Sequence, residues 1–283
     1  MKKKFLNYMA VLLASTLFFA CSKKEVVDRG LTESTLDASF TIATINMNNY
    51  IAQVKDSSYI LSKWDLGTGT ATVGKATQPI FLPDAGSYQI THYAIGKGGA
   101  TFTSSQTINV TTSDPARGNL IQGGKFETAD DESKWTRLTI GAPAITWTRS
   151  GGKLVATGGS WGHSAVYQAI QVEANKDYRF GMTVAGSGAT DTWFEVFFGT
   201  TVPVQNVDYS SGGVRIALNT WAGCGNSTFN GNIATIGCAG SLVGQAGKVR
   251  FTQAGTIYVL IKTGGADLGA NGISIDNIEL RGI

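Results

Sequence analysis

The segment spanning residues 192–221 begins with TWFEVFFGTT and ends with VRIALNTW. Side chains in a β-strand alternate between two faces, so Phe194 and Val196 are expected on one face and Trp193 and Glu195 on the other. The first face is apolar enough for a protein core. The second face combines a large aromatic ring with a carboxylate, which a buried layer tolerates poorly, so we expect it to point outward.

The end of the same segment has the same two-sided pattern. One face carries the apolar residues Val214, Ile216 and Leu218. The other face is polar with an aromatic end, and its members are Arg215, Ala217, Asn219 and Trp221. Two strands of one sheet would therefore share an unusual outer face, and the sequence leaves open whether the rings of Trp193 and Trp221 lie side by side.

The composition indicates an all-β protein with room for two domains. The 283 residues are 42% hydrophobic and include 36 glycines but only 5 prolines, as expected for short strands joined by tight turns. The formal net charge of +3 comes from 23 basic and 20 acidic residues, and residues 2–4 are three lysines in a segment that we expect to be removed. No basic stripe and no phosphate-binding loop occur in the sequence, so no nucleic-acid partner is expected.

The N-terminus is typical of an export signal. Residues 1–20 combine a lysine-rich start with a short apolar run, and Ala20 directly precedes Cys21. The run FFAC resembles the bacterial lipoprotein box, which implies that Cys21 is acylated; the alternative is an ordinary secretory signal with an incidental cysteine. Ser22 resembles an outer-membrane sorting signal, and KKE at residues 23–25 resembles the charged tag of surface lipoproteins in Bacteroidota. These resemblances imply lipid anchoring in the outer membrane, with the chain exposed at the cell surface.

Two further cysteines, Cys224 and Cys238, remain in a chain that we expect to be exported. Because exported proteins favour disulfides, we expect these two to pair. Closing a loop of about 15 residues would stabilise the fold by about 3 kcal/mol in the chain-entropy model. A zinc site is not expected, since two cysteines without a nearby histidine do not supply four ligands.

The first expected domain follows a polar stretch at residues 21–34, which has no periodicity and is typical of a flexible tether. Residues 35–113 hold short alternating runs bounded by turn residues, which predicts a small β-sandwich. WDLGTG at residues 64–69 resembles the WDFGDG turn of PKD domains, and AGSYQI at residues 85–90 resembles their later tyrosine strand. The resemblance implies an immunoglobulin-like spacer without a functional site. The tryptophan of the turn is expected in the core and His92 at the surface.

The second expected domain covers residues 114–283 and follows a turn-rich junction. NLI at residues 119–121 and FE at residues 126–127 resemble the NLIxNGxFE opening of jelly-roll carbohydrate-binding modules of the family 4, 9 and 22 type. Later strands of those modules are similar to VYQ at 166–168, YRF at 178–180 and IDNIEL at 275–280. The whole chain is therefore expected to be all-β, an immunoglobulin-like PKD sandwich followed by a jelly-roll β-sandwich.

Five of the six tryptophans lie in the second domain. Indole rings bind sugars by stacking on their apolar C–H faces, while polar side chains hydrogen-bond the hydroxyls. Trp161 sits in a glycine-rich loop where a ring is hard to bury, and Trp193 and Trp221 lie on the outer faces described above. We therefore expect a carbohydrate-binding platform whose members are Trp161, Trp193, Trp221, Glu195, Asn219 and His163.

The other aromatic residues of this domain are weaker candidates. Trp147 is expected in the core, Trp135 is compatible with either core or contact, and Tyr209 is a minor candidate for ligand contact. If the platform is correct, Trp193→Ala and Trp221→Ala are each expected to reduce glycan retention and to leave the melting temperature nearly unchanged.

The resemblance to carbohydrate-binding modules also implies a structural calcium ion away from the sugar. Its usual carboxylates map to Glu127 of the FE turn and Asp276 of the closing strand. Oxygen ligands of this kind suit a hard cation. The alternative is that Glu127 only makes hydrogen bonds within its turn.

Three classes of function remain open. The resemblances favour a surface lipoprotein that is not an enzyme, binds a polysaccharide such as the β-glucan laminarin, and supports its uptake with an outer-membrane glycan transporter. A polysaccharide hydrolase or lyase with an unrecognised site is the second class, although no strand shows the paired carboxylates typical of glycosidases. The third class is an adhesion or scaffold lipoprotein that binds no soluble glycan.

Overall fold

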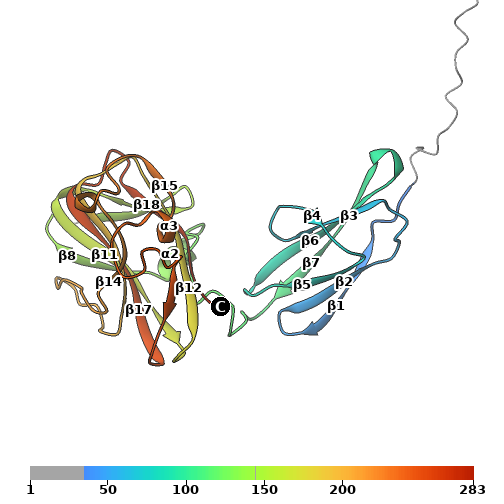
Figure 1. The fold of residues 1–283 in the computed structure, drawn as a ribbon, viewed down its shortest axis with the longest axis horizontal. Helices are drawn as coiled ribbons and strands as arrows, with labels where there is room; N and C mark the ends of the chain where they lie inside the picture. Colours follow the sequence, from blue (N-terminus) through green and yellow to red (C-terminus); the bar gives the residue numbers. More distant parts are fainter. Residues whose placement is uncertain (1–34, 144) are drawn as a thin grey trace, which may run out of the picture. The chain divides into compact units, whose positions relative to one another are not determined.

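The computed structural model describes residues 35–143 and 145–283, and this part of the chain is almost entirely β-structure. It divides into two compact units, whose elements are labelled in Figure 1. The first unit contains residues up to 81 together with 87–109, and the second contains residues 82–86 and 110–283. The prediction of an all-β fold built from sandwiches is confirmed.

The predicted signal at residues 1–20, the lipidation of Cys21 and the tether at residues 21–34 lie outside the described residues. Within the described residues, no helix is long and apolar enough to cross a membrane.

The first unit consists of a three-stranded and a four-stranded antiparallel sheet. The three-stranded sheet has the order β1 (Phe40–Asn46), β2 (Asn49–Val54) and β5 (Thr77–Phe81). The four-stranded sheet has the order β4 (Thr72–Val73), β3 (Leu61–Leu66), β6 (Gly86–Ile95) and β7 (Thr101–Val110), with the short η2 (Lys97–Gly99) between the last two. The specific resemblance of this unit to PKD domains stays a prediction.

His92 lies in the core of the first unit, so its predicted place at the surface is wrong. It is fully buried, and its ring stacks on that of the equally buried Trp64 with 4.5 Å between centroids. Both ring nitrogens have partners, because Nε2 lies 3.0 Å from the hydroxyl of Ser62 and Nδ1 lies 2.8 Å from the carbonyl oxygen of Ala38. A histidine whose two nitrogens are satisfied can be buried without a large desolvation penalty. Trp64 is in the core, as predicted.

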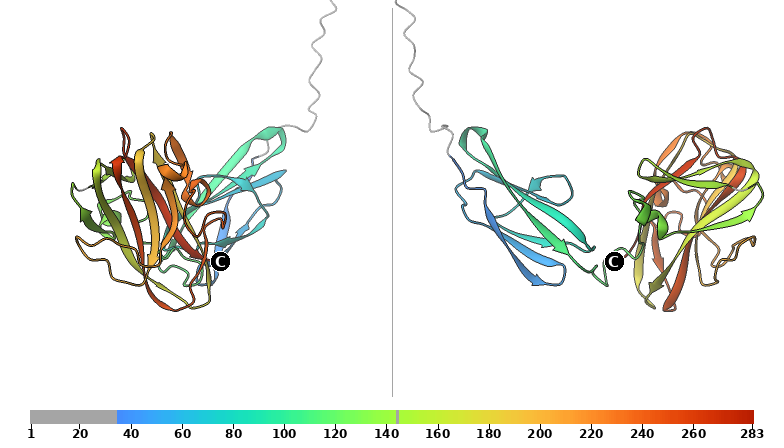
Figure 2. Two further views of the ribbon diagram at one scale, coloured as in Figure 1. Left: turned by 60° about the vertical axis from the view of Figure 1, so that its left-hand side comes forward. Right: turned by 180° about the vertical axis from the view of Figure 1, so that it is seen from behind.

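The second unit is a sandwich of two larger sheets (Figures 1 and 2). The first sheet has the order β14 (Val214–Asn219), β13 (Thr190–Gly199), β17 (Gly255–Asp267), β11 (Gly159–Val172) and β8 (Thr136–Gly141). The second has the order β15 (Phe229–Asn232), β12 (Asp177–Gly186), β18 (Ile273–Gly282), β10 (Lys153–Thr157) and β9 (Thr146–Ser150), with β16 (Lys248–Arg250) also paired to β12. The short helices α2 (Ala129–Ser133), η3 (Thr220–Ala222) and α3 (Ile233–Ile236) connect strands.

The main core of the second unit lies between these two sheets. Phe194 and Val196 belong to it and are fully buried, as the alternation predicts. Trp135 and Trp147 belong to it as well, and their indole nitrogens donate to the carbonyl oxygen of Gly123 and to the Ser164 hydroxyl. The opposite face of the five-stranded sheet, called the outer face below, is therefore the face to which Trp193 and Glu195 point.

Candidate functional site

The three tryptophans predicted to form a platform meet at one end of the outer face. The ring centroids of Trp161 and Trp221 are 6.4 Å apart with an interplanar angle of 21°. The centroids of Trp221 and Trp193 are 6.3 Å apart at 25°. His163 continues the row, with its ring 6.0 Å from that of Trp193. The sequence left open whether these rings are neighbours, and the structure brings all four together.

The platform rings overlap only partly, as the large exposed fractions of Trp161 and Trp221 show. Trp161 is 58% exposed and Trp221 is 56% exposed, whereas Trp193 is half-buried. Trp221 lies near both other rings, and a ring covered on both faces would be mostly buried. Nearly parallel, offset indoles with this much exposed surface present a wide apolar area to solvent, which is rare for side chains of this size in a soluble protein.

Glycine in the neighbouring strands lets His163 and Trp193 approach each other. Gly264 of β17 pairs with both residues, one on each side. A Cβ atom at Gly264 would lie 2.4 Å from the His163 Cβ and 2.8 Å from Trp193 Cζ2. Gly141 of β8 likewise leaves room for the imidazole, because a Cβ there would lie 2.7 Å from Cε1 of His163. The two glycines therefore leave the space into which these rings fit.

Trp161 is held out of the sheet by a bulge in β11. The register of β11 against β17 shifts between Gly159 and Gly162, and Ser160 and Trp161 both have positive φ, at 54° and 66°. A non-glycine residue in this left-handed region costs about 1–2 kcal/mol, and strain of this kind concentrates at binding sites. Gly162 closes the bulge, because a Cβ there would lie 1.6 Å from the carbonyl oxygen of Pro143.

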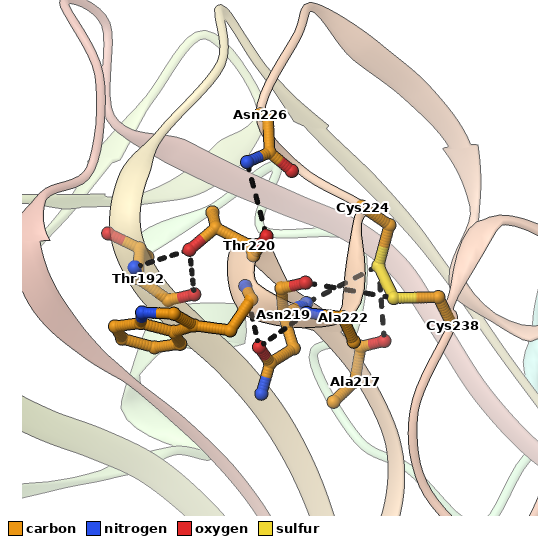
Figure 3. Close-up of a disulfide and its surroundings, with 9 residues drawn as sticks. Thr192, Ala217, Asn219, Thr220, Ala222, Cys224, Asn226 and Cys238 are labelled. Atoms are coloured by element: carbon orange, nitrogen blue, oxygen red, sulfur yellow. Dashed lines mark hydrogen bonds between the residues drawn. A yellow bond between two sulfur atoms is a disulfide. The ribbon is translucent and has the colours of Figure 1, made fainter.

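Trp221 is positioned by a capped turn next to the disulfide. Asn219 ends β14, and its side-chain oxygen accepts hydrogen bonds from the backbone N–H groups of Trp221 (3.0 Å) and Ala222 (3.2 Å). Figure 3 shows this cap, with the amide nitrogen of Asn219 directed away from the disulfide. The oxygen of Asn219 therefore orients Trp221, which leaves the amide nitrogen as the atom available to a ligand.

The predicted disulfide between Cys224 and Cys238 is confirmed. The disulfide, drawn in Figure 3, links the residues that follow η3 to the segment that follows α3. The backbone N–H of Cys238 donates to the carbonyl oxygen of Ala217 on β14. The covalent link thus fixes the loop that carries Trp221 against the end of the sheet.

Next to the platform, Glu195 forms part of an ionic cluster centred on buried Lys262, with Asp208, 63% exposed, at its outer edge. Lys262 pairs with Glu195 across β13 and β17, and its Nζ lies 3.4 Å from Glu195 Oε2 and 2.9 Å from Asp208 Oδ1. The same ammonium donates to the carbonyl oxygen of Tyr209 and lies 4.9 Å from the centroid of Phe197. The side chains of Lys262 and Glu195 are only 9% and 17% exposed.

The environment of the cluster shifts the pKa values of its two carboxyl groups in opposite directions. Burial raises the pKa of Glu195, and the charge of Lys262 offsets only part of that effect. Burial also opposes ionisation of Asp208, but the hydrogen bond and charge of Lys262 outweigh it and lower the pKa of that carboxyl. Glu195 shares the outer face with Trp193, as predicted, but its carboxylate is engaged by lysine and little exposed. Glu195 therefore lies next to the platform rings but presents little of its carboxylate to a ligand.

Tyr209 does not contribute to the accessible surface. It is buried in a small apolar cluster with Phe197 and Leu260, where the 200–213 loop packs on the outer face. Its hydroxyl donates to the carbonyl oxygen of Thr201. The prediction of Tyr209 as a minor contact is wrong, because the loop folds back and satisfies the hydroxyl internally.

The predicted calcium ligands do not form a metal cage by themselves. Glu127 is exposed beside Gly152, and Asp276 accepts hydrogen bonds from the backbone and side-chain nitrogens of Asn277, at 2.7 and 3.0 Å. The part of the chain that the structure describes contains no group of three or more His, Cys, Asp or Glu side chains that could hold a metal ion. Calcium takes six to eight oxygen ligands, which two carboxylates do not supply, so the ion stays a prediction.

Several residues that shape the site were missed at the level of sequence. Lys262 carried a usable signal, since it interrupts the apolar strand YVLIKTGG with a charge that needs a partner. Asp208 counts in the sequence only as one of several carboxylates that could accompany Glu195. The two glycines under His163 carry no signal, because their roles depend on contacts between strands far apart in sequence.

A scan of the sequence against protein-family models gives no match, and a search of the curated proteins gives none. Among solved structures, the chain is similar to carbohydrate-binding modules of the β-sandwich superfamily described as promiscuous in specificity, with 14% identity, a TM-score of 0.30, and coverage of 86% of this chain and 96% of that one. A carbohydrate-binding module described as CBM4 has 12% identity and a TM-score of 0.35, over 58% of this chain and 99% of that one.

The enzymatically active domain of tailspike protein 4 from bacteriophage CBA120 is a further match, with 16% identity and a TM-score of 0.37 over 58% of this chain. The match spans only 21% of the tailspike chain. TM-scores of this size describe a partial similarity of fold only.

Proposed function

We propose that the second unit binds a polysaccharide by stacking its sugar rings on Trp161, Trp193 and Trp221. The observation that carries the proposal is the continuous row of three partly exposed indoles at one end of the sheet. A strained bulge, a capped turn and a disulfide hold two of these rings in place before any ligand arrives. Such preorganisation lowers the entropy lost on binding.

Polar groups next to the rings supply the directional contacts that sugars need. His163 lies beside Trp193, and the Asn219 amide nitrogen has no hydrogen-bond partner among the described residues. Both groups can bond hydroxyls at the edge of a stacked sugar. Glu195 contributes at most one oxygen, because the other faces Lys262.

The ligand class is an uncharged glycan chain, and we propose a β-glucan such as laminarin as the first candidate. This choice rests on the resemblance of the sequence to modules of the family 4, 9 and 22 type. The same resemblance, together with the lipoprotein-like N-terminus, supports a role at the outer-membrane surface that delivers glycan to a transporter.

The test is affinity electrophoresis of the full chain in gels that contain laminarin, other β-glucans, xylan, or charged marine polysaccharides. We expect retardation by at least one neutral glycan and loss of that retardation in Trp161→Ala, Trp193→Ala and Trp221→Ala. A chain that migrates normally in every gel would instead support the scaffold alternative.

A glycoside hydrolase is the second candidate, and one observation favours it. Glu195 and Asp208 contact the same ammonium, and their pKa values are shifted apart, as in an acid and base pair. Release of reducing ends from the retained glycan, abolished in Glu195→Gln, would establish hydrolysis. Retention without release would assign the cluster a structural role under the binding face.

A further inference from the structure

A cavity lies at the end of the five-stranded sheet opposite the tryptophan platform. It has a volume of about 320 Å³ and lies where β13 ends and β17 begins. Trp193 and Phe198 are five residues apart on β13, so the cavity is displaced along the sheet from the platform by about 17 Å. Its size falls within the range of about 300–1,000 Å³ that is typical of small-molecule sites.

The cavity has an apolar floor and a polar rim. Phe198, Phe251 and Ile257 are buried, and the rings of the two phenylalanines meet edge to face at 6.0 Å. The rim includes Thr252, Gln253 and the two cations Arg215 and Arg250. No acidic residue lines the cavity.

A bulge in β14 directs Arg215 toward this cavity. Ile216 pairs with Val196 and Val214 pairs with Phe197, so Arg215 is the extra residue without an opposite in β13. Bulges re-aim side chains, and this one breaks the alternation that would place Arg215 on the outer face with Ala217. The sequence pattern alone predicted that outer-face position.

The guanidinium of Arg215 has unused hydrogen-bonding capacity. Its Nε is buried and has no hydrogen-bond partner, and within the described part of the chain the side chain forms no ion pair. Buried polar atoms are satisfied by protein or water in the great majority of native structures, so this donor in a cavity wall is available to an acceptor that enters the cavity. A carboxylate fits best, because it accepts from Nε and a terminal nitrogen of one arginine at once.

Arg250 leaves further positive charge at the rim. Its guanidinium lies 3.2 Å from Asp177 Oδ1, but the other oxygen of Asp177 lies 3.0 Å from Lys248. One carboxylate therefore neutralises two cations. Both cations are more than half exposed, so the pairs are weak and Arg250 can turn to an incoming anion.

We propose that this cavity is a second ligand site, which binds the carboxylate or sulfate group of an acidic sugar through Arg215 and Arg250. The shared chemistry is a carboxylate or sulfate group carried by a sugar. The proposal does not depend on the tryptophan platform, since the two sites share no residue.

The test is a titration of the full, ¹⁵N-labelled chain followed by NMR, with glucuronate, glucose 6-sulfate and uncharged glucose as separate probes. The Nε–H group of Arg215 gives its own signal, which reports directly on the unsatisfied donor. We expect glucuronate or the sulfate to shift that signal and the backbone signals of residues 250–257. Glucuronate acting alone would identify a carboxylate site, and the sulfate acting alone a sulfate site.

Variants separate the proposed contact from general charge attraction. Arg215→Gln is expected to weaken binding of the effective probe about tenfold or more, and Arg250→Gln, at an exposed position, by a smaller factor. Arg137→Gln removes the same charge from an exposed residue of β8 outside the cavity and is expected to have no effect.

Four results would overturn the proposal. One is that neither anion shifts the Arg215 signal; another is that glucose shifts the same signals equally; the third is that the shifts of residues 250–257 persist unchanged in both cavity variants. Shifts confined to the three platform indoles would also count against it, because they would place the acidic sugar on the platform.

Discussion

Removal of Trp221 is the perturbation with the clearest expected outcome. The ring is the middle member of the row, so Trp221→Ala interrupts the stacking surface between Trp161 and Trp193. Truncation of a central aromatic residue in a binding site typically costs about 2 kcal/mol or more, which corresponds to a loss of affinity of about 30-fold. We therefore expect near-complete loss of retention in affinity electrophoresis.

The effect of the same change on stability is small by comparison. Trp221 is 56% exposed, and what it loses is two ring contacts, each of which contributes about 0.5–1.5 kcal/mol when well packed. With more than half of the ring in water we take the lower end, about 1 kcal/mol in total, or about 2–4 °C in melting temperature for a unit of this size. Because the rings pack against each other, we expect this small decrease in melting temperature, whereas the sequence alone predicts a nearly unchanged value.

Buried Trp147 provides the matched control for this experiment. Trp147→Ala removes a core ring that is hydrogen-bonded to Ser164, and it is expected to cost about 3–5 kcal/mol of stability. Scanning calorimetry on both variants gives the comparison. If Trp221→Ala unfolds as readily as Trp147→Ala, or if it binds glycan as well as the parent chain, then Trp221 is not the centre of a binding surface.

Four further outcomes are expected. Gly264→Ala places a methyl group between two rings of the site and should weaken glycan binding as well as lower the melting temperature; unchanged binding would contradict the proposed geometry. Lys262→Met leaves Glu195 buried without its cation and should cost about 3 kcal/mol near neutral pH. Because the folded-state pKa of Glu195 is raised above its unfolded value, protonation favours the folded state, and this cost should shrink as the pH falls toward the ordinary range of a glutamate; a cost independent of pH in denaturant titrations would refute the assignment. The double variant Cys224→Ser/Cys238→Ser should lose about 3 kcal/mol of stability and bind more weakly, and a variant that binds equally well would show that the loop needs no covalent support. A chelator should lower the melting temperature if the predicted calcium is bound, and an unchanged melting curve would remove that ion from the account.

Much of the second unit could be predicted from local sequence pattern. Alternation alone placed Phe194 and Val196 in the core and Trp193 and Glu195 on the outer face, because the period of a strand is fixed by its geometry. The glycine-rich surroundings of Trp161 correctly indicated an exposed ring. The disulfide followed from the number of cysteines that remain in an expected exported chain.

The parts that failed depend on contacts between distant segments. His92 looked like a surface residue until its partners Ser62 and Ala38 were known, and Tyr209 looked available until the loop that carries it packed on the outer face. Arg215 followed the alternation rule in sequence and broke it through a bulge. Periodicity cannot reveal a bulge, since it reports on each strand without its neighbour.

The meeting of the three platform rings is likewise non-local. It requires two consecutive positive-φ residues before Gly162, which form the bulge that carries Trp161, and a capped turn after Asn219, which carries Trp221. Both features bring their rings to the end of β13 where Trp193 lies. Sequence pattern identified which rings were available to a ligand. Only the packing of loops determined that they form one surface.

The central claim is tested most directly by the six indole N–H signals of the chain in an NMR titration with a retained glycan. Three of these groups are internal references, because the indole nitrogens of Trp64, Trp135 and Trp147 donate to protein oxygens in the two cores. We predict that the glycan shifts the signals of the platform rings, Trp161, Trp193 and Trp221, and leaves the three references in place. A retained glycan that shifts none of the platform signals would contradict the proposed site.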